Sequence, residues 1–191
     1  MLLNTPNKLT VLRVIMVPVF LMFLFVDAIP LHWLWALIVF AAASITDTLD
    51  GHLARKNGQV TTFGKFLDPL ADKILVLSAM IAFIELGLCG AVPVILMIAR
   101  EFMVTSLRLV AVSGSGKVIA AGILGKVKTV VQMVSVIVIM ALAFVSNLNV
   151  LPFILPVGLI GEVLMWISAA LSTVSGAEYI WKNREAITQF K

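Results

Sequence analysis

Long apolar runs, separated by short stretches that contain polar residues, glycine or proline, dominate the pattern of this chain. A helix needs about 20 apolar residues to cross the hydrocarbon core of a bilayer. Helices also suit lipid because they satisfy their backbone hydrogen bonds internally. The pattern therefore predicts an all-α, polytopic membrane protein with six transmembrane helices, built as a single domain over residues 1–191. The predicted spans are residues 9–26, 33–54, 66–86, 92–112, 118–145 and 152–181.

The distribution of basic residues predicts how these helices are oriented. Six spans place both termini on the same side of the membrane. The three connections on the other side, near residues 27–32, 86–91 and 146–151, contain no Lys or Arg. Cytoplasmic loops carry an excess of Lys and Arg. We therefore expect a multi-pass protein of the cell membrane with cytoplasmic termini, and with the 55–65 loop and the 113–128 region also in the cytoplasm.

Composition supports the membrane assignment and narrows the partners. Hydrophobic residues make up 61% of the 191 residues and charged residues 13%, and the mean hydropathy is +1.11. A soluble protein of this size would lack the polar surface to cover its core. The net charge of +4 could suggest nucleic acid, but the basic residues are scattered through apolar segments. We expect no nucleic acid; an anionic lipid surface or an anionic substrate fits better.

Four aspartates, Asp47, Asp50, Asp68 and Asp72, lie within 26 residues. Asp47 and Asp50 are three residues apart near the predicted cytoplasmic end of the second span. Asp68 and Asp72 are four residues apart at the start of the third. Each pair therefore shares one helix face. The short connection makes the two helices antiparallel neighbours, so the two faces can meet.

Four carboxylates around one point would repel one another and be costly to desolvate. Hard cations relieve both problems, and oxygen ligands without His or Cys select Mg²⁺, Mn²⁺ or Ca²⁺ rather than zinc. The sequence therefore predicts a divalent-metal site. The alternative is that the aspartates pair with Arg55, Lys65 and Lys73 as solvated helix ends.

Residues beside the carboxylates favour a phosphate-containing ligand. Gly51 and Ala54 leave space next to the first pair, and Gly64 does so one turn before Asp68. Arg55 is a bidentate phosphate donor immediately beside the acids. Metal ions with an arginine alongside suit a pyrophosphate better than a bare ion, and this combination is typical of phosphoryl transfer.

The pattern Asp-x2-Asp-Gly-x2-Ala-Arg-x8-Gly-x3-Asp-x3-Asp over residues 47–72 resembles the signature of the CDP-alcohol phosphotransferases. All eight positions match, and the resemblance extends over nearly the whole chain. In that family an acceptor hydroxyl attacks a CDP-linked lipid or alcohol and CMP is released. The resemblance implies that the four aspartates bind two ions, Mg²⁺ or Mn²⁺, and that Asp72 is also the general base.

The same resemblance implies a set of residues that contact the CDP-lipid. These are Asn7, Thr10, Gly51, Arg55, Thr61 and Gly64. From the residues alone, Asn7 and Thr10 could equally be helix caps. Dimers are common in the family, so a homodimer is a further expectation, although the sequence identifies no interface.

A second group of charged residues bears on the acceptor: Arg100, Arg108, Lys126 and Lys128. Arg100 and Arg108 are eight residues apart, and so lie within roughly 80° of each other around a helix. With the two lysines they could bind the phosphate of a phosphorylated acceptor. Two alternatives stay open. The lysines could be ordinary positive-inside flanking residues, and Arg100 could pair with Glu101 or Glu162.

The segment Gly-Lys-x-Lys-Thr-x2-Gln at residues 125–132 and the Arg100-Glu101 pair resemble the phosphatidylglycerophosphate synthases within that family. This resemblance implies CDP-diacylglycerol as the donor and glycerol 3-phosphate as the acceptor. Asp72 would take a proton from the glycerol 1-hydroxyl, which attacks the lipid-bonded β-phosphorus. CMP leaves, and phosphatidylglycerol phosphate stays among the membrane lipids.

Other functions remain to be separated from this one. Within the family, the alternatives are synthases of phosphatidylserine, cardiolipin or inositol phospholipids. Outside it, a cation transporter would also carry carboxylates in its spans. The aspartates lie at helix ends rather than midway through, and no pair of broken helices is evident, which favours the enzyme. The sequence assigns no role to Glu162 or Glu178.

Overall fold

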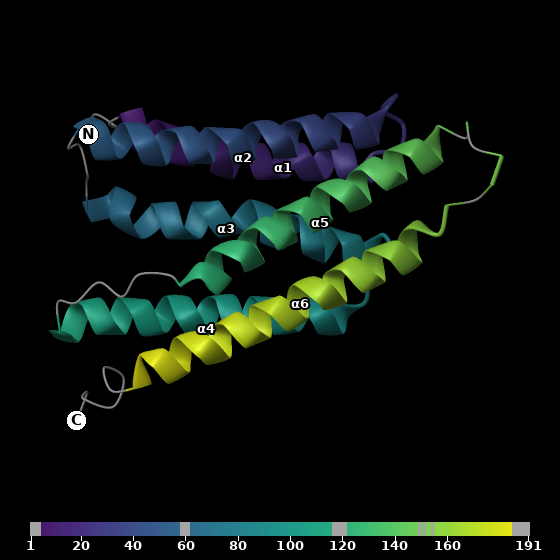
Figure 1. Ribbon diagram of the computed structural model, residues 1–191. Helices are drawn as coiled ribbons and strands as arrows, with labels where there is room; N and C mark the ends of the chain where they lie inside the picture. Colours follow the sequence, from purple (N-terminus) through teal and green to yellow (C-terminus); the bar gives the residue numbers. More distant parts are fainter. Residues whose placement is uncertain are drawn as a thin grey trace. The chain divides into compact units, whose positions relative to one another are not determined.

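The computed structural model describes residues 5–57, 62–115, 122–148, 150, 152–153 and 155–184. Within these residues the chain forms six α-helices and no strand, which confirms the all-α prediction (Figure 1). The helices are α1 (Thr5–Phe25), α2 (His32–Asn57), α3 (Thr62–Glu85), α4 (Ala91–Ser115), α5 (Ile123–Asn147) and α6 (Val157–Lys182).

The observed helices begin and end within a few residues of the predicted spans. The largest differences lie at the starts of α5 and α6, which begin at Ile123 and Val157 rather than at 118 and 152. A residue that precedes a proline is disfavoured in the helical conformation. Leu155 precedes Pro156, so a helix beginning at Pro152 would be interrupted there, and α6 begins after the second proline.

Two helices in the described part of the chain, α5 and α6, are long and apolar enough to cross a membrane. Shorter apolar helical stretches cover residues 11–25 and 32–45. The helices thus agree with a membrane protein. Six spans and cytoplasmic termini stay predictions.

The chain divides into two compact units. The first unit comprises Met1–Leu86 and Val136–Val157, and the second comprises Gly87–Ser135 and Gly158–Lys191. In the first unit, α1 packs against both α2 and α3. Phe20 of α1 and Phe40 of α2 are both fully buried, with ring centroids 5.8 Å apart at a tilt of 50°, a favourable geometry for aromatic pairs. The prediction of a single domain stays a prediction.

A buried histidine joins three helix ends of the first unit. The Nδ1 atom of His32, at the start of α2, lies 3.2 Å from the Phe23 carbonyl oxygen near the end of α1. Because a carbonyl only accepts, Nδ1 carries the proton and Nε2 is the acceptor. Asn147 Nδ2, at the end of α5, donates to Nε2 over 3.0 Å. These bonds fix the ends of the helices to one another.

In the second unit, Glu162 of α6 stabilises the beginning of α4. Its carboxylate accepts the backbone N–H of Gly90, the residue just before α4, and the indole N–H of Trp166 over 2.7 Å. A carboxylate at a helix N-terminus satisfies unpaired N–H groups and complements the helix dipole. Burial, together with the charge of Glu162, raises the pKa of the nearby Cys89 thiol to about 11. Glu178, also unassigned from sequence, pairs with Lys182 one turn later.

The turn between α3 and α4 requires glycine at one position. Gly87 has a φ of +67°, a left-handed conformation that costs other residues free energy. The carbonyl oxygen of Gly87 would lie 3.1 Å from a Cβ atom added to Gly158. Two glycines thus allow the turn to approach the first residues of α6.

Candidate functional site

The two aspartate pairs predicted to bind metal lie on α2 and α3, which belong to the same unit. Asp47 and Asp50 lie in the second half of α2, and Asp68 and Asp72 in the first half of α3. The two helices run in opposite directions (Figure 1). Both pairs therefore lie toward the helix ends that adjoin residues 58–61. The four side chains lie outside the described part of the structure.

The predicted CDP-lipid residues also fall on helices of the first unit. Gly51 and Arg55 lie in α2, Gly64 in α3, and Asn7 and Thr10 in α1. Their side chains are outside the described residues, as is the whole of Thr61. Helix α1 begins at Thr5, before both Asn7 and Thr10, which argues against the helix-cap alternative. Since α1 packs against α2 and α3, the fold gathers these three segments into one bundle.

The metal prediction rests on the chemistry of the donor set. The side chains that the structure describes include no group of three or more His, Cys, Asp or Glu residues that could hold a metal ion. The side chains of the four aspartates are not among them. Their carboxylate oxygens are the ligands that Mg²⁺ and Mn²⁺ prefer, so the residues fit the predicted ions by type. Metal binding stays a prediction.

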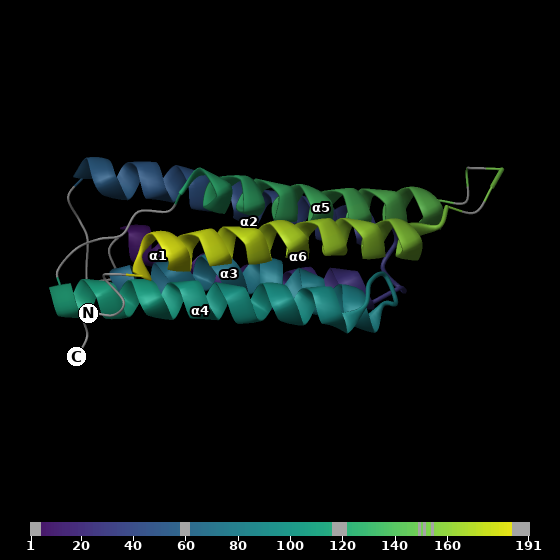
Figure 2. The ribbon, with the colours of Figure 1, turned by 60° about the horizontal axis from the view of Figure 1, so that its bottom comes forward.

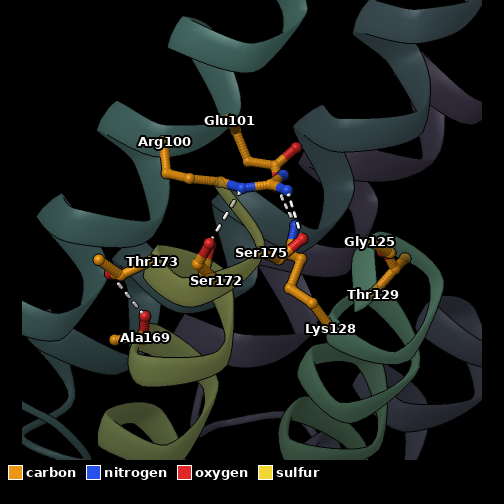
Figure 3. A network of polar contacts seen from close by, with 9 residues as sticks. All are labelled: Arg100, Glu101, Gly125, Lys128, Thr129, Ala169, Ser172, Thr173 and Ser175. Carbon is orange, nitrogen blue, oxygen red and sulfur yellow. Dashed lines mark hydrogen bonds and ion pairs between the residues drawn. The ribbon is translucent and has the colours of Figure 1, made fainter. Parts of the chain in front are cut away.

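The second unit contains a network of buried polar side chains from α4, α5 and α6, with Arg100 at its centre (Figure 3). Arg100 reaches across from α4 to α6, where its Nε donates to the Ser172 carbonyl oxygen over 3.1 Å. One terminal nitrogen donates to Ser175 Oγ over 2.9 Å and the other to Glu101 Oε1 over 3.0 Å. The guanidinium is thus bonded at all three nitrogens, and the Arg100 side chain is 11% exposed. This is the form in which a buried charge is tolerated.

Glu101 is shared between two cations. The same Oε1 atom that accepts from Arg100 also accepts the Lys128 ammonium of α5. The Glu101 and Lys128 side chains are only 10% and 4% exposed. Removing one partner of a buried ion pair leaves the other charge uncompensated. The two cations and the carboxylate therefore act as one group that joins α4, α5 and α6.

The four basic residues predicted to bind the acceptor lie in different surroundings. Arg100 makes the pair with Glu101 that was the alternative to phosphate binding, and Lys128 is buried on the same carboxylate. Lys126 is exposed at the start of α5. Arg108 is half-buried, with its guanidinium carbon 5.8 Å from the centre of the Tyr179 ring. Two of the four are thus bound within the protein, and the acceptor assignment stays a prediction.

The α6 partners of this network were missed in the sequence, although a spacing signal exists. Ser168, Ser172, Ser175 and Tyr179 recur at intervals of three and four residues, which places them along one side of α6. All four are buried. Ser168 and Ser135 of α5 are hydrogen-bonded over 3.1 Å. Such small polar residues let apolar helices approach and bond to one another.

Gly176 of α6 has no side chain and so leaves room for Arg100 beside α6. A Cβ atom added at Gly176 would lie 2.8 Å from Arg100 Cγ and 3.3 Å from its Nε. Figure 2, which turns the molecule, shows α4 and α6 side by side as Figure 1 does. The glycine thus lets the Arg100 side chain lie flat against α6.

The comparisons with known proteins identify the family. A family model described as CDP-alcohol phosphatidyltransferase matches residues 3–174. The chain belongs to this family. The predicted resemblance is thereby confirmed, and the match includes every residue predicted for the metal, donor and acceptor sites.

Several bacterial relatives are similar over most of their length. The CDP-diacylglycerol–glycerol-3-phosphate 3-phosphatidyltransferase of Bacillus subtilis is 41% identical, over 96% of this chain and 97% of the relative. The Rickettsia bellii protein of the same name is 37% identical, over 92% and 93% respectively. A probable phosphatidylglycerophosphate synthase of Mycobacterium tuberculosis is 39% identical, over 93% and 80%.

The family match also divides the network of α4, α5 and α6. It includes Arg100, Glu101 and Lys128 but ends at residue 174. Ser175 and Tyr179 lie beyond it.

Proposed function

We propose that this chain transfers the phosphatidyl group of CDP-diacylglycerol to glycerol 3-phosphate, which yields phosphatidylglycerol phosphate and CMP. The observation that carries the proposal is the near full-length similarity to relatives that bear this activity in their names. The aspartate and arginine pattern of residues 47–72, placed on two adjoining helix ends of one unit, supports it. We place the site on the cytoplasmic side of a multi-pass membrane protein.

In this proposal the first unit binds the donor. Asp47, Asp50, Asp68 and Asp72 would hold two Mg²⁺ or Mn²⁺ ions, which supply charge neutralisation for the pyrophosphate when bound. Arg55 donates a planar pair of N–H groups to the same phosphates. The remaining contacts to the CDP-lipid come from Asn7, Thr10, Gly51, Thr61 and Gly64. The apolar faces of the helices accommodate the acyl chains.

Asp72 serves as the general base. It takes the proton of the glycerol 3-phosphate 1-hydroxyl, whose oxygen forms a bond to the lipid-bonded β-phosphorus. The bond between that phosphorus and the oxygen bridging to the cytidine monophosphate breaks, and CMP departs with the electron pair. A positioned base contributes about 10²–10⁴-fold to the rate.

The acceptor phosphate is assigned to the basic residues of the second unit, Arg100, Arg108, Lys126 and Lys128. The described contacts support different tasks for them. Arg100 and Lys128 neutralise Glu101 and hold three helices together. Arg108 and Lys126 have no ion pair among the contacts that the structure describes. These two are the stronger candidates for direct contact with the phosphate.

An acceptor panel tests the proposed function. Purified protein in neutral detergent micelles receives CDP-diacylglycerol, Mg²⁺ or Mn²⁺, and one of four acceptors: glycerol 3-phosphate, serine, inositol phosphate or phosphatidylglycerol. We expect CMP release with glycerol 3-phosphate alone, abolished by EDTA and restored by excess divalent ion. Release with another acceptor would assign the chain to another synthase. Cation flux in liposomes without any CMP release would favour the transporter.

A further inference from the structure

His32 lies where three helix ends of the first unit meet, and each of its ring nitrogens has a defined partner. Nδ1 donates to the Phe23 carbonyl oxygen of α1 over 3.2 Å. Nε2 accepts from Asn147 Nδ2, at the end of α5, over 3.0 Å. The residue is only 5% exposed, and a buried polar ring depends on such bonds. The bond to Asn147 requires the neutral ring, because Nε2 must offer a lone pair.

A second group lies within reach of the same nitrogen. Asp27 Oδ1, in the turn between α1 and α2, is 3.6 Å from His32 Nε2. That distance is too long for a hydrogen bond but suits an ion pair once the ring is charged. The protonated ring donates at both nitrogens, so Nε2 would face a donor in Asn147 and an acceptor in Asp27. Protonation therefore favours exchange of the α5 partner for the partner in the turn.

The charged groups near the ring come from few elements. Residues 136–157, the part of the first unit that includes the end of α5, contain no charged residue. Helix α3, which runs opposite to α2, ends at Glu85. None of the ion pairs that the structure describes joins Glu85 to the ring. The Trp33 ring lies 5.5 Å from the His32 ring, centre to centre. Asp27 is thus the carboxylate that the described contacts place beside Nε2.

The backbone before His32 fixes the start of α2 without help from the ring. Leu31 has a φ of +55°, which is uncommon outside glycine and persists only where surrounding contacts hold it. The Leu31 carbonyl oxygen accepts the N–H groups of Leu34 and Trp35 over 2.9 and 3.1 Å. The His32 N–H donates to the Ile29 carbonyl oxygen over 3.2 Å. These backbone bonds do not change with pH, so a change at Nε2 acts on α5 rather than on α2.

We propose that His32 is a pH-dependent joint. In its neutral form it holds the end of α5 through Asn147, and in its protonated form it pairs with Asp27 and releases α5. Imidazole is the side chain whose charge ordinarily changes between about pH 5 and pH 8. The sequence predicts that the connections near residues 27–32 and 146–151 lie on the side opposite the cytoplasm, so the proton would come from outside the cell. The inference does not depend on the proposed function, because it uses only contacts at these helix ends.

A distance measurement tests the release of α5. The full chain carries spin labels at Ala28→Cys and Leu148→Cys, two exposed positions beside the joint, in a Cys89→Ser background that removes the one natural cysteine. Electron paramagnetic resonance in neutral detergent micelles gives the distance distribution at about pH 8 and about pH 5, the limits of ordinary imidazole titration. We expect the population at longer distance to rise at least about fivefold at the lower pH, the effect of losing one hydrogen bond.

His32→Gln is the matched control, because glutamine is polar but neutral at both pH values. We expect its distance distribution to be the same at both. If His32→Gln fails to fold, Asn147→Leu replaces it, since it removes the α5 partner and should show the longer distance at either pH. A response to pH that persists in either variant would mean that another group drives it, and would overturn the inference.

Ring NMR signals of labelled histidine report the protonation itself. The chain has two histidines, and the signal missing from a His32→Gln or His32→Asn sample belongs to His32. We expect a ring protonated at Nδ1 alone at about pH 8 and at both nitrogens at about pH 5. A ring that stays neutral at the lower pH would overturn the inference. So would a ring that becomes protonated while the distance stays the same, because the Asn147 amide would then have turned to accept through its oxygen.

Discussion

The aspartate segment of α2 and α3 and the buried network of α4, α5 and α6 introduce charge into apolar helices in opposite ways. The first concentrates four carboxylates within 26 residues. The second pairs one carboxylate, Glu101, with two cations, Arg100 and Lys128, and adds hydroxyl and carbonyl groups from α6. A group of opposite charges is stabilised by its own members. A group of like charges needs cations, so we assign the chemistry to the first region and the positioning to the second.

The assignment of the chemistry to the aspartate segment would fail if the aspartates proved dispensable for activity. In Asp72→Asn the base is lost while size and shape are kept. We expect CMP release to fall by about 10²–10⁴-fold, as for loss of a general base. The measurement is CMP release at saturating substrates and Mg²⁺. Asp27→Asn is the matched control, because Asp27 is 89% exposed in the turn between α1 and α2. If both variants kept full activity, the assignment of chemistry to this region would be wrong.

In the network of α4, α5 and α6, the loss of a charge should lower the free energy of unfolding. In Glu101→Gln, Arg100 and Lys128 remain buried without their counter-charge. We expect a loss of about 3–5 kcal/mol in the free energy of unfolding, typical of a broken buried ion pair. Unfolding in detergent micelles would measure it. The double variant Glu101→Gln with Lys128→Met removes one of the stranded charges and should recover part of the loss.

A control for Glu101 exists elsewhere in the chain. Glu178→Gln makes the same substitution in the pair with Lys182, whose side chain is 61% exposed. An exposed pair contributes about 0–1 kcal/mol, so the variant should unfold almost like the wild type. Equal losses for Glu101→Gln and Glu178→Gln would mean that the network has no special structural role.

The smallest effect should come from a single methyl group beside the network. In Gly176→Ala the new Cβ would lie 2.8 Å from Arg100 Cγ. Arg100 is held at three nitrogens and can yield only by weakening those bonds. We expect a loss of about 1–3 kcal/mol, the range for overpacked sites. Gly122→Ala is the control, since its Cβ would meet Glu178 at 3.8 Å, an ordinary contact. A Gly176→Ala variant as stable as Gly122→Ala would show that Arg100 repacks freely.

The helices and the family could be read from the sequence because both depend on local patterns. Apolar runs of about 20 residues predict helices directly, and six helices appear within a few residues of the predicted spans. The starts of α5 and α6 were placed too early. There the runs remain apolar, and the helix boundary at α6 is set by the backbone restriction that Pro156 imposes. The aspartate pattern identified the family, since it lies within one stretch of two consecutive helices.

The sequence by itself determined the helical class, the family and the residues expected to bind metal and donor. Each depends on spacing within one or two neighbouring helices, which the chain fixes before any long-range contact forms. Only the tertiary structure decided what the acidic and basic residues of α4, α5 and α6 do. Arg100 and Ser175 are 75 residues apart, and Glu101 and Lys128 are 27 apart. Which charges are neutralised inside the protein depends on how these separate helices pack, because a hydrogen bond forms only at about 3 Å.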